Sequence, residues 1–204
     1  MSIHKLIRIE KQTDNKWLNI YKAVYETEKG EFKYEFASRR TQENLVMFNK
    51  KTQPDAVRVV PYFIKNGKTY VVITMEYRYA LNRIIYGVPA GLIDKGETPE
   101  QAAVREVMEE AGAKVIKLNM VETASYTSAG LTDESLISFE AEVELLGKQR
   151  LEDTEDIKLQ TVEVNNIPEM LDKYDFALQS KLLLRAFYYR ERIKQLEKTE
   201  EKEA

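Results

Sequence analysis

The segment 91–113, GLIDKGETPEQAAVREVMEEAGA, constrains this chain most, because it encodes one well-delimited helix that carries several carboxylates. Thr98 is a preferred N-cap residue, Pro99 suits the first helical position, and Gln101 can complete a capping box with Thr98. Gly112 can end the helix in a left-handed conformation. The sequence therefore predicts a helix between Thr98 and Gly112, preceded by a loop.

Three glutamates of this helix, Glu106, Glu109 and Glu110, fall within about one and a half turns. Like charges at this spacing repel by roughly a few tenths of a kcal/mol on an exposed helix, and by more in a cleft without a cation. A solvated acidic surface is the common explanation of such a run. Here the glycines, glutamate and arginine at fixed positions around it favour a bound divalent cation, and oxygen ligands are typical of Mg²⁺ or Mn²⁺.

The complete pattern resembles the Nudix box, which has a glycine, a glutamate six residues on, then an arginine–glutamate pair, an aliphatic residue, two glutamates and a glycine. The matching residues are Gly91, Glu97, Arg105, Glu106, Val107, Glu109, Glu110 and Gly112. Ala113 is smaller than the usual last aliphatic residue. The resemblance implies an α/β fold, an α/β/α sandwich containing a loop–helix–loop, and metal-dependent hydrolysis of a nucleoside diphosphate linked to another group.

The resemblance also implies roles for individual residues. The expected ligands of Mg²⁺ or Mn²⁺ are the carbonyl of Ala90 and the side chains of Glu106, Glu109 and Glu110, and Glu109 is counted among the catalytic residues too. The expected structural residues are Gly91, Glu97, Arg105 and Gly112. Within that second group, Glu97 and Arg105 are expected to pair and fix the loop to the helix.

A further carboxylate is expected to deprotonate or orient the attacking water. In the resembling enzymes it comes from a mobile loop before the last strand, and the matching loop here contains Glu152, Asp153, Glu155 and Asp156. Glu155 is the expected base, and Asp153 is the next candidate. The alternative is a solvated acidic loop without a catalytic role.

Other segments resemble the ADP-ribose pyrophosphatase branch of the family. That branch has a QYR-type or QFR-type triplet, where this chain has Glu76-Tyr77-Arg78, followed by a PAGLID-type segment, here 89–94, and an SPG-type loop, here 128–134. Two positions depart from the pattern. Ala129 stands in place of the loop proline, and Gly87 stands where many members have a glutamate that assists a metal. Candidates to replace that carboxylate are Glu76, Asp94 and Glu134.

In that branch the N-terminal sheet exchanges between two subunits, and an aromatic residue from each stacks on the adenine. Trp17 and Tyr34 align with those aromatics, and stacking on a base contributes roughly 1–3 kcal/mol. Arg39 and Arg78 match arginines that hold the diphosphate or ribose. The alternatives are aromatic residues that simply pack a sheet, and arginines that only face solvent.

The chain divides into an expected N-terminal antiparallel β unit, residues 1–50, for dimerisation and base contacts, and a catalytic domain, residues 51–204, with a C-terminal helix. Expected strands are 17–26, 32–38, 56–64, 69–77, 83–88, 114–126, 134–145 and 158–164, and further helices are 167–173 and 175 to about 198. Asn66-Gly67 predicts a hairpin turn. The first unit is too small to be stable alone, which predicts a homodimer.

Composition excludes several other classes of protein. The net charge of −3, without a basic stripe, argues against nucleic-acid binding. The sequence has no apolar run of about 18 residues, so no membrane span is expected. Cysteine is absent, which excludes disulfides and thiolate nucleophiles and fits the cytoplasm, and His4 is the only histidine. Chemistry is therefore expected to depend on carboxylates, metals and arginines.

These observations predict an enzyme that hydrolyses a nucleoside diphosphate sugar, with ADP-ribose giving AMP and ribose 5-phosphate. Two alternatives remain at this point. One is the same reaction on another nucleoside diphosphate derivative, such as GDP-mannose. The other is a Nudix module that binds a ligand without turning it over.

Overall fold

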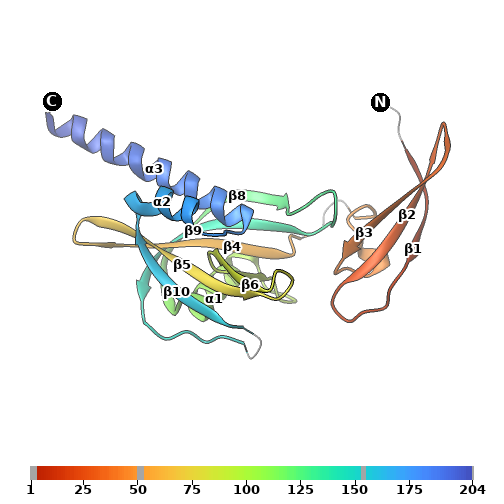
Figure 1. Cartoon of the computed structure of the whole chain (residues 1–204), viewed down its shortest axis with the longest axis horizontal. Helices are drawn as coiled ribbons and strands as arrows, with labels where there is room; N and C mark the ends of the chain where they lie inside the picture. Colours follow the sequence, from red (N-terminus) through yellow and green to blue (C-terminus); the bar gives the residue numbers. More distant parts are fainter. Residues whose placement is uncertain (1–3, 50–52, 153–154, 204) are drawn as a thin grey trace. The chain divides into compact units, whose positions relative to one another are not determined.

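A computed structural model describes residues 4–49, 53–152 and 155–203 of the chain (Figure 1). The chain forms two compact units. The first comprises Met1–Asp55 together with Ala124–Leu136, and the second comprises Ala56–Thr123 together with Ile137–Ala204. In the described part of the chain, no helix is both long enough and apolar enough to cross a membrane.

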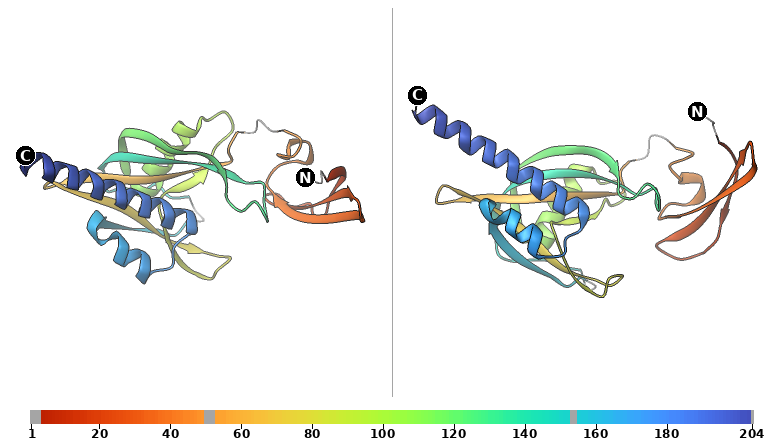
Figure 2. Two further views of the ribbon diagram at one scale, coloured as in Figure 1. Left: turned by 90° about the horizontal axis from the view of Figure 1, so that it is seen from above. Right: turned by 45° about the horizontal axis from the view of Figure 1, so that its top comes forward.

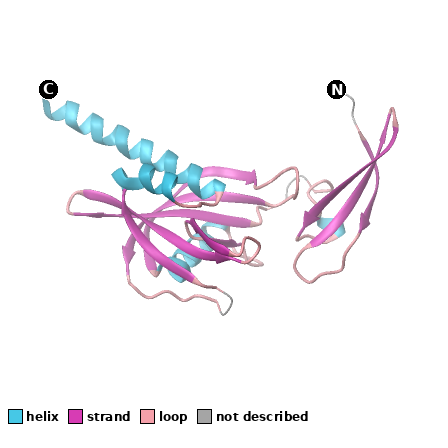
Figure 3. Ribbon diagram, viewed as in Figure 1, coloured by secondary structure: helices cyan, strands magenta, loops and turns pink. Residues whose placement is uncertain are grey.

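The first unit is built on an antiparallel sheet of β1 (Lys5–Lys11), β2 (Asn19–Thr27) and β3 (Gly30–Ser38), in that order, followed by the short 3-10 helix η1 (Gln42–Asn44) (Figure 3). Tyr21, Ala23 and Phe36 on one face of the sheet pack against the fully buried Leu45. The strands expected at 17–26 and 32–38 are present as β2 and β3. Strand β1 was not predicted, because a bulge between Leu6 and Arg8 interrupts its alternation of polar and apolar residues.

The second sheet has the order β10-β5-β4-β9-β8, and β6 also pairs with β5 while β7 pairs with β4. Its strands are β4 (Ala56–Lys65), β5 (Lys68–Arg78), β6 (Arg83–Gly87), β7 (Ala90–Leu92), β8 (Ala113–Tyr126), β9 (Ser135–Leu145) and β10 (Ile157–Glu163). Asn66 and Gly67 both have positive φ, 52° and 74°, which confirms the predicted hairpin turn between β4 and β5. Strand β7 is too short for its sequence pattern to reveal it.

Helices cover both faces of this sheet (Figure 2). Helix α1 (Pro99–Ala111) packs on one face through residues such as Val107, against Val57 and Phe139. The turn η2 (Val164–Asn166) and the helices α2 (Ile167–Lys173) and α3 (Leu178–Glu203) pack on the other face, where the buried residues include Leu184. The arrangement confirms the α/β/α fold expected from the sequence.

The two ends of α1 also form as predicted. The Gln101 amide donates to Thr98 Oγ1 at 3.3 Å, and the Thr98 amide donates to Gln101 Oε1 at 2.8 Å. Gly112 ends the helix with φ 57° and ψ 39°. The C-terminal helix begins later than expected, at Leu178, because the backbone of Asp175 and Ala177 hydrogen-bonds with Tyr86 on β6.

Candidate functional site

Arg105 connects the loop before α1 to the helix itself. Its Nε and Nη2 atoms donate to the two carboxylate oxygens of Glu97, each at 3.0 Å, and Nη2 also donates to the carbonyl of Leu92 at 2.8 Å. Glu97 Oε2 accepts a second hydrogen bond, from the Asp94 amide, at 3.0 Å. These bonds to Arg105 hold the pKa of Glu97 below its ordinary value, and the bonds to Glu97 raise the pKa of Arg105. The structure thus contains the expected loop-fixing pair.

Two glycines allow close approaches that a side chain would block. A Cβ atom at Gly91 would overlap the carboxylate of Glu106. A Cβ atom at Gly112 would lie 2.8 Å from the backbone carbon of Lys148, and its positive φ also disfavours other residues. Gly91 therefore brings the backbone of β7 against the acidic face of α1, and Gly112 lets the following loop pass close to the end of the helix.

The predicted metal ligands lie together at this contact. Glu106 and Glu110 are buried, and Glu110 Oε2 accepts a hydrogen bond from the Ala90 amide at 3.2 Å. Glu109 is half-buried. Arg105 Nη1 donates to Glu106 Oε1 at 2.6 Å and to Glu109 Oε2 at 3.1 Å, so this cation lies beside two of the three glutamates.

The charge of this cluster is only partly compensated. Burial raises the pKa of Glu106 to about 7, against the hydrogen bond from Arg105. Burial, together with the charge of Glu106, raises the pKa of Glu110 to about 9. A divalent cation would supply the missing positive charge, and carboxylate and carbonyl oxygens are suitable donors for Mg²⁺ or Mn²⁺.

In this structure Glu106, Glu109 and Glu110 are not arranged as the ligands of a metal ion. Among the residues that the structure describes, no group of three or more histidine, cysteine, aspartate or glutamate side chains is arranged to hold a metal. Glu106 and Glu109 are oriented towards Arg105. The residue types and the uncompensated charge fit a cation, and in this structure Arg105 pairs with one carboxylate oxygen of Glu106 and one of Glu109.

The acidic loop before β10 is tied to the carboxyl end of α1. The Arg150 amide donates to the carbonyl of Glu109 at 2.8 Å, and Gln149 Nε2 donates to the carbonyl of Glu110 at 2.6 Å. Glu155 lies further along this loop, and its charge contributes to the raised pKa of both Glu106 and Glu110. Sequence reasoning missed Gln149 and Arg150, because their partners are backbone atoms.

Of the two candidates for the base, only Glu155 can be placed. Glu155 is half-buried, and its Oε2 accepts a hydrogen bond from the Glu152 amide at 2.9 Å. Asp153 lies outside the described residues.

The three candidates to replace the carboxylate at Gly87 differ in their surroundings. Asp94 has a side chain that is 78% exposed. Glu134 belongs to the first unit, where its Oε2 accepts a hydrogen bond from Arg39 Nε at 3.1 Å. Glu76 lies at the end of β5 with a side chain that is only 22% exposed, 2.7 Å from Arg78 Nη2. The charge of Glu76 helps to raise the pKa of Glu110, so Glu76 interacts electrostatically with a glutamate of α1.

The predicted base-binding residues Trp17 and Tyr34 belong to the first unit, as does Arg39, whereas Arg78 belongs to the second. Trp17 is 69% exposed, and Lys16 Nζ lies 4.4 Å from the centre of its ring. Tyr34 donates a hydrogen bond from its hydroxyl group to the carbonyl of Gly130 at 2.5 Å. Tyr34 is 38% exposed, and neither aromatic side chain belongs to the buried clusters found among the described residues.

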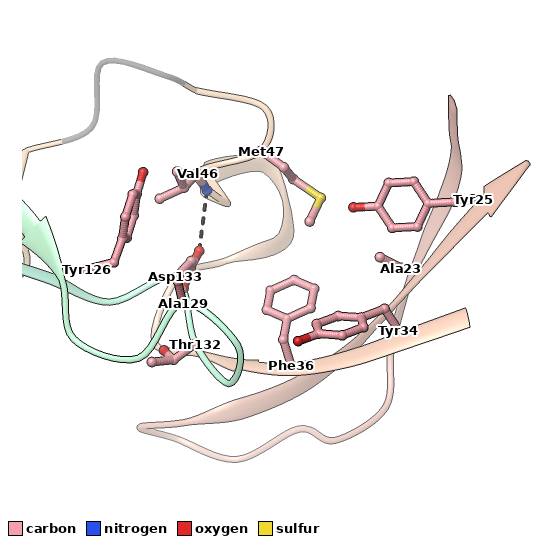
Figure 4. Close-up of a pocket in the computed structure, with 10 residues that line it drawn as sticks. All are labelled: Ala23, Tyr25, Tyr34, Phe36, Val46, Met47, Tyr126, Ala129, Thr132 and Asp133. Carbon is pink, nitrogen blue, oxygen red and sulfur yellow. Dashed lines mark hydrogen bonds between the residues drawn. The ribbon is translucent and has the colours of Figure 1, made fainter. Parts of the chain in front are cut away.

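Tyr34 also lines a cavity of about 310 Å³ within the first unit (Figure 4). The walls are mostly aromatic and apolar, with one carboxylate, and include Tyr25, Tyr34, Phe36, Met47, Tyr126 and Asp133. Ala129, the residue in place of the loop proline, lines it as well. Asp133 Oδ2 accepts a hydrogen bond from the Val46 amide at 3.3 Å. Trp17 and Arg39 are not among the lining residues.

Comparisons with known proteins agree with this fold. A family model described as the NUDIX domain matches residues 52–184. The chain is similar to putative nudix hydrolase 2 of Caenorhabditis elegans, with 30% identity over 132 residues, 65% of this chain and 57% of that protein. It is also similar to the ADP-ribose pyrophosphatase of Bacillus subtilis, with 38% identity over 111 residues, 54% of this chain and 58% of that protein.

The chain thus matches less than two thirds of the length of each of these two relatives. A solved structure described as an ADP compounds hydrolase superposes with a TM-score of 0.73 and 20% sequence identity, covering 95% of both chains. This likeness shows the fold.

Proposed function

This chain belongs to the Nudix family, and we propose that it hydrolyses the diphosphate bond of a nucleoside diphosphate sugar, with ADP-ribose giving AMP and ribose 5-phosphate. The observation that carries the proposal is the set of partly compensated glutamates on α1, held against the Ala90 backbone beside an acidic loop. Similarity to ADP-ribose pyrophosphatases supports the choice of substrate.

Mg²⁺, or Mn²⁺, is the proposed cofactor, and the residues that would hold it are the carbonyl of Ala90 and the side chains of Glu106, Glu109 and Glu110. When bound, such a cation neutralises the diphosphate and lowers the pKa of water. Glu155 takes the proton from the attacking water, whose oxygen forms a bond to phosphorus as the diphosphate P–O bond breaks. Asp153 remains the second candidate for this role.

The remaining predicted residues bind the substrate in this proposal. Arg78 clamps the phosphates, because a guanidinium can donate two parallel hydrogen bonds to phosphate oxygens. Its ion pair with Glu76 must open or be shared when it does so. Trp17 and Tyr34 stack on the base, and Arg39 contacts the diphosphate or ribose, in a homodimer formed through the first unit.

The test is a substrate screen on the full chain. ADP-ribose, GDP-mannose, diadenosine polyphosphates and NADH are each incubated with and without Mg²⁺, and the products are separated by chromatography. We expect Mg²⁺-dependent formation of AMP and ribose 5-phosphate from ADP-ribose at the highest kcat/KM. Faster turnover of GDP-mannose would move the proposal to that substrate, and the absence of Mg²⁺-dependent turnover on every diphosphate would refute it.

Variants of α1 separate an enzyme from a module that only binds a ligand. Glu109→Gln and Glu110→Gln are expected to lower kcat/KM by about 100-fold or more, since each removes a proposed metal ligand. Glu100→Gln, which neutralises an exposed glutamate in the first turn of the same helix, is the matched control and should retain wild-type activity. A rate that is equal in all three variants would show that the measured turnover does not depend on the box.

A further inference from the structure

We infer that Glu76 is an additional carboxylate ligand of the metal site on α1 and replaces the carboxylate that is absent at Gly87. This inference rests on the proposed function and adds a residue to the same site. It is supported by the register of three strands, by the burial and charge of Glu76, and by the space around Gly87.

Strand register places Glu76 on the side of the sheet that faces α1. Val72 packs with α1 in a buried cluster, and side chains alternate along β5, so Glu76 projects from the same face as Val72. Glu76 pairs with Ile85 on β6 and with Ile157 on β10. The next residue, Tyr77, donates its amide to the carbonyl of Asp156 at 3.3 Å. Glu76 therefore lies beside the loop that contains Glu155.

Glu76 interacts electrostatically with the acidic residues around α1. Burial raises the pKa of Glu76 although Arg78 and Arg58 oppose this shift, and the charge of Glu155 adds to it. Glu76 in turn contributes to the raised pKa of Glu110. A half-buried carboxylate in this setting gains from a shared divalent cation, as its neighbours on α1 do.

Gly87 stands on β6 directly opposite Thr74, two residues before Glu76 on the neighbouring strand. A Cβ atom at Gly87 would lie 3.3 Å from Ser180 Oγ on α3 and 3.4 Å from Thr74 Oγ1. A side chain at position 87 would thus begin in tight contact with the hydroxyl group of Ser180 and in ordinary van der Waals contact with that of Thr74. Glu76 offers a carboxylate from the adjacent strand, and in this structure that carboxylate pairs with Arg78.

The test measures Mn²⁺ binding to the full chain without substrate, by the electron paramagnetic resonance signal of free Mn²⁺. Glu76→Gln is expected to weaken the affinity by about tenfold or more, or to remove one bound ion per chain. Glu100→Gln is the matched control, because it neutralises an exposed carboxylate in the first turn of α1, and its affinity should equal that of the wild type. Circular dichroism melting shows that each variant is folded.

Two further variants separate a ligand from a residue that acts at a distance. Glu76→Asp keeps the charge but withdraws the carboxylate by one methylene group, so a ligand role predicts weakened binding in this variant too. Arg78→Gln removes the partner of Glu76 and should leave the Mn²⁺ affinity of the free protein within about twofold, a change of roughly 0.4 kcal/mol.

Each outcome has a distinct meaning. The inference is overturned by wild-type Mn²⁺ affinity in Glu76→Gln, by wild-type affinity in Glu76→Asp, or by an equal loss in Arg78→Gln, which would make Glu76 only a partner of that arginine. A wild-type chain that binds no Mn²⁺ would instead refute the proposed function. Weakened binding in both Glu76 variants, with unchanged binding in Glu100→Gln and Arg78→Gln, supports the inference.

Discussion

At the scale of single residues, Arg105 is the side chain that joins the box loop to its helix, and its planar geometry matters as much as its charge. We expect Arg105→Lys to lower the free energy of unfolding by about 1–3 kcal/mol, because lysine cannot donate to both oxygens of Glu97 and to the Leu92 carbonyl together. Urea unfolding followed by circular dichroism measures the loss.

The control for this variant is Arg83→Lys, at an ion pair with Asp175 in which both side chains are largely exposed. Exposed pairs contribute little, so this change should stay within about 0.5 kcal/mol of the wild type. An equal loss of unfolding free energy in the two variants would contradict a special role for the several hydrogen bonds that the Arg105 guanidinium donates.

Glu155 is tested by separating the rate from metal binding. Glu155→Gln should lower kcat by about 10²–10⁴-fold if this carboxylate takes the proton of the attacking water. The Mn²⁺ affinity should change much less than the rate, because the proposed ligands remain. Glu152→Gln, in the same loop but exposed, is the control and should keep its kcat. An unchanged kcat in Glu155→Gln would shift the role to another carboxylate, with Asp153 the next to test.

The sequence could indicate some of these residues and not others, for a physical reason. The glutamates of α1, together with Glu97 and Arg105, are linked by helical and loop spacing within one short segment. The position of Glu76 depends instead on the pairing of β5 with β6 and β10, which a single sequence does not specify. Gln149 and Arg150 bind backbone carbonyls of α1. The sequence therefore contains no complementary side chain that would indicate these contacts.

At the scale of elements, the same distinction explains which strands and helices could be predicted. Helix α1 was delimited correctly because its capping residues act within a few positions of each end. Strand β1 was missed because of its bulge, and the first turn expected for α3 is absent because residues 175–177 pair with β6. Local chemistry therefore determined both ends of α1, whereas pairing with a distant strand determined where α3 begins.

Helix α1 should also give the metal-free protein a distinctive dependence of stability on pH. Glu106 and Glu110 have pKa values of about 7 and about 9 in the folded state, above the ordinary 4.5. The unfolded chain loses these protons first as the pH rises, so stability falls between about pH 4.5 and pH 9, by at most about 1.4 kcal/mol per pH unit and carboxyl group. Thermal melting in EDTA across this range measures the fall.

Added Mg²⁺ should oppose this loss, because a cation favours the ionised carboxylates in the folded state. The rise in melting temperature on adding Mg²⁺ is expected to be larger at pH 8.5 than at pH 5.5, and Glu110→Gln should reduce the difference. An equal effect of Mg²⁺ at both pH values would argue against binding at these glutamates.

At the scale of the whole molecule, the two compact units carry different parts of the proposed reaction. The second unit contains the Nudix box, Arg78 and the acidic loop, which carry the proposed metal ligands, one proposed diphosphate ligand and the proposed base. The first unit contains Trp17 and Tyr34, which are proposed to stack on the base, and Arg39, which is proposed to contact the diphosphate or ribose. A dimer formed through the first unit would therefore affect the choice of substrate more than the hydrolytic chemistry.

The first unit provides the last prediction, which is that the chain is a homodimer. Its sheet exposes Phe32 and Tyr34 on the strand β3, which lies at the edge of the sheet, and an exposed apolar edge is a ready surface for pairing with a second copy. Light scattering at micromolar concentration should give twice the chain mass of 23.8 kDa. Phe32→Asp places a charge on this exposed aromatic surface and should shift the mass towards the monomer, while Leu131→Asp, at an exposed loop position of the same unit, should not. A monomeric wild-type mass would contradict the dimer, and an unchanged mass in Phe32→Asp would move the interface away from β3.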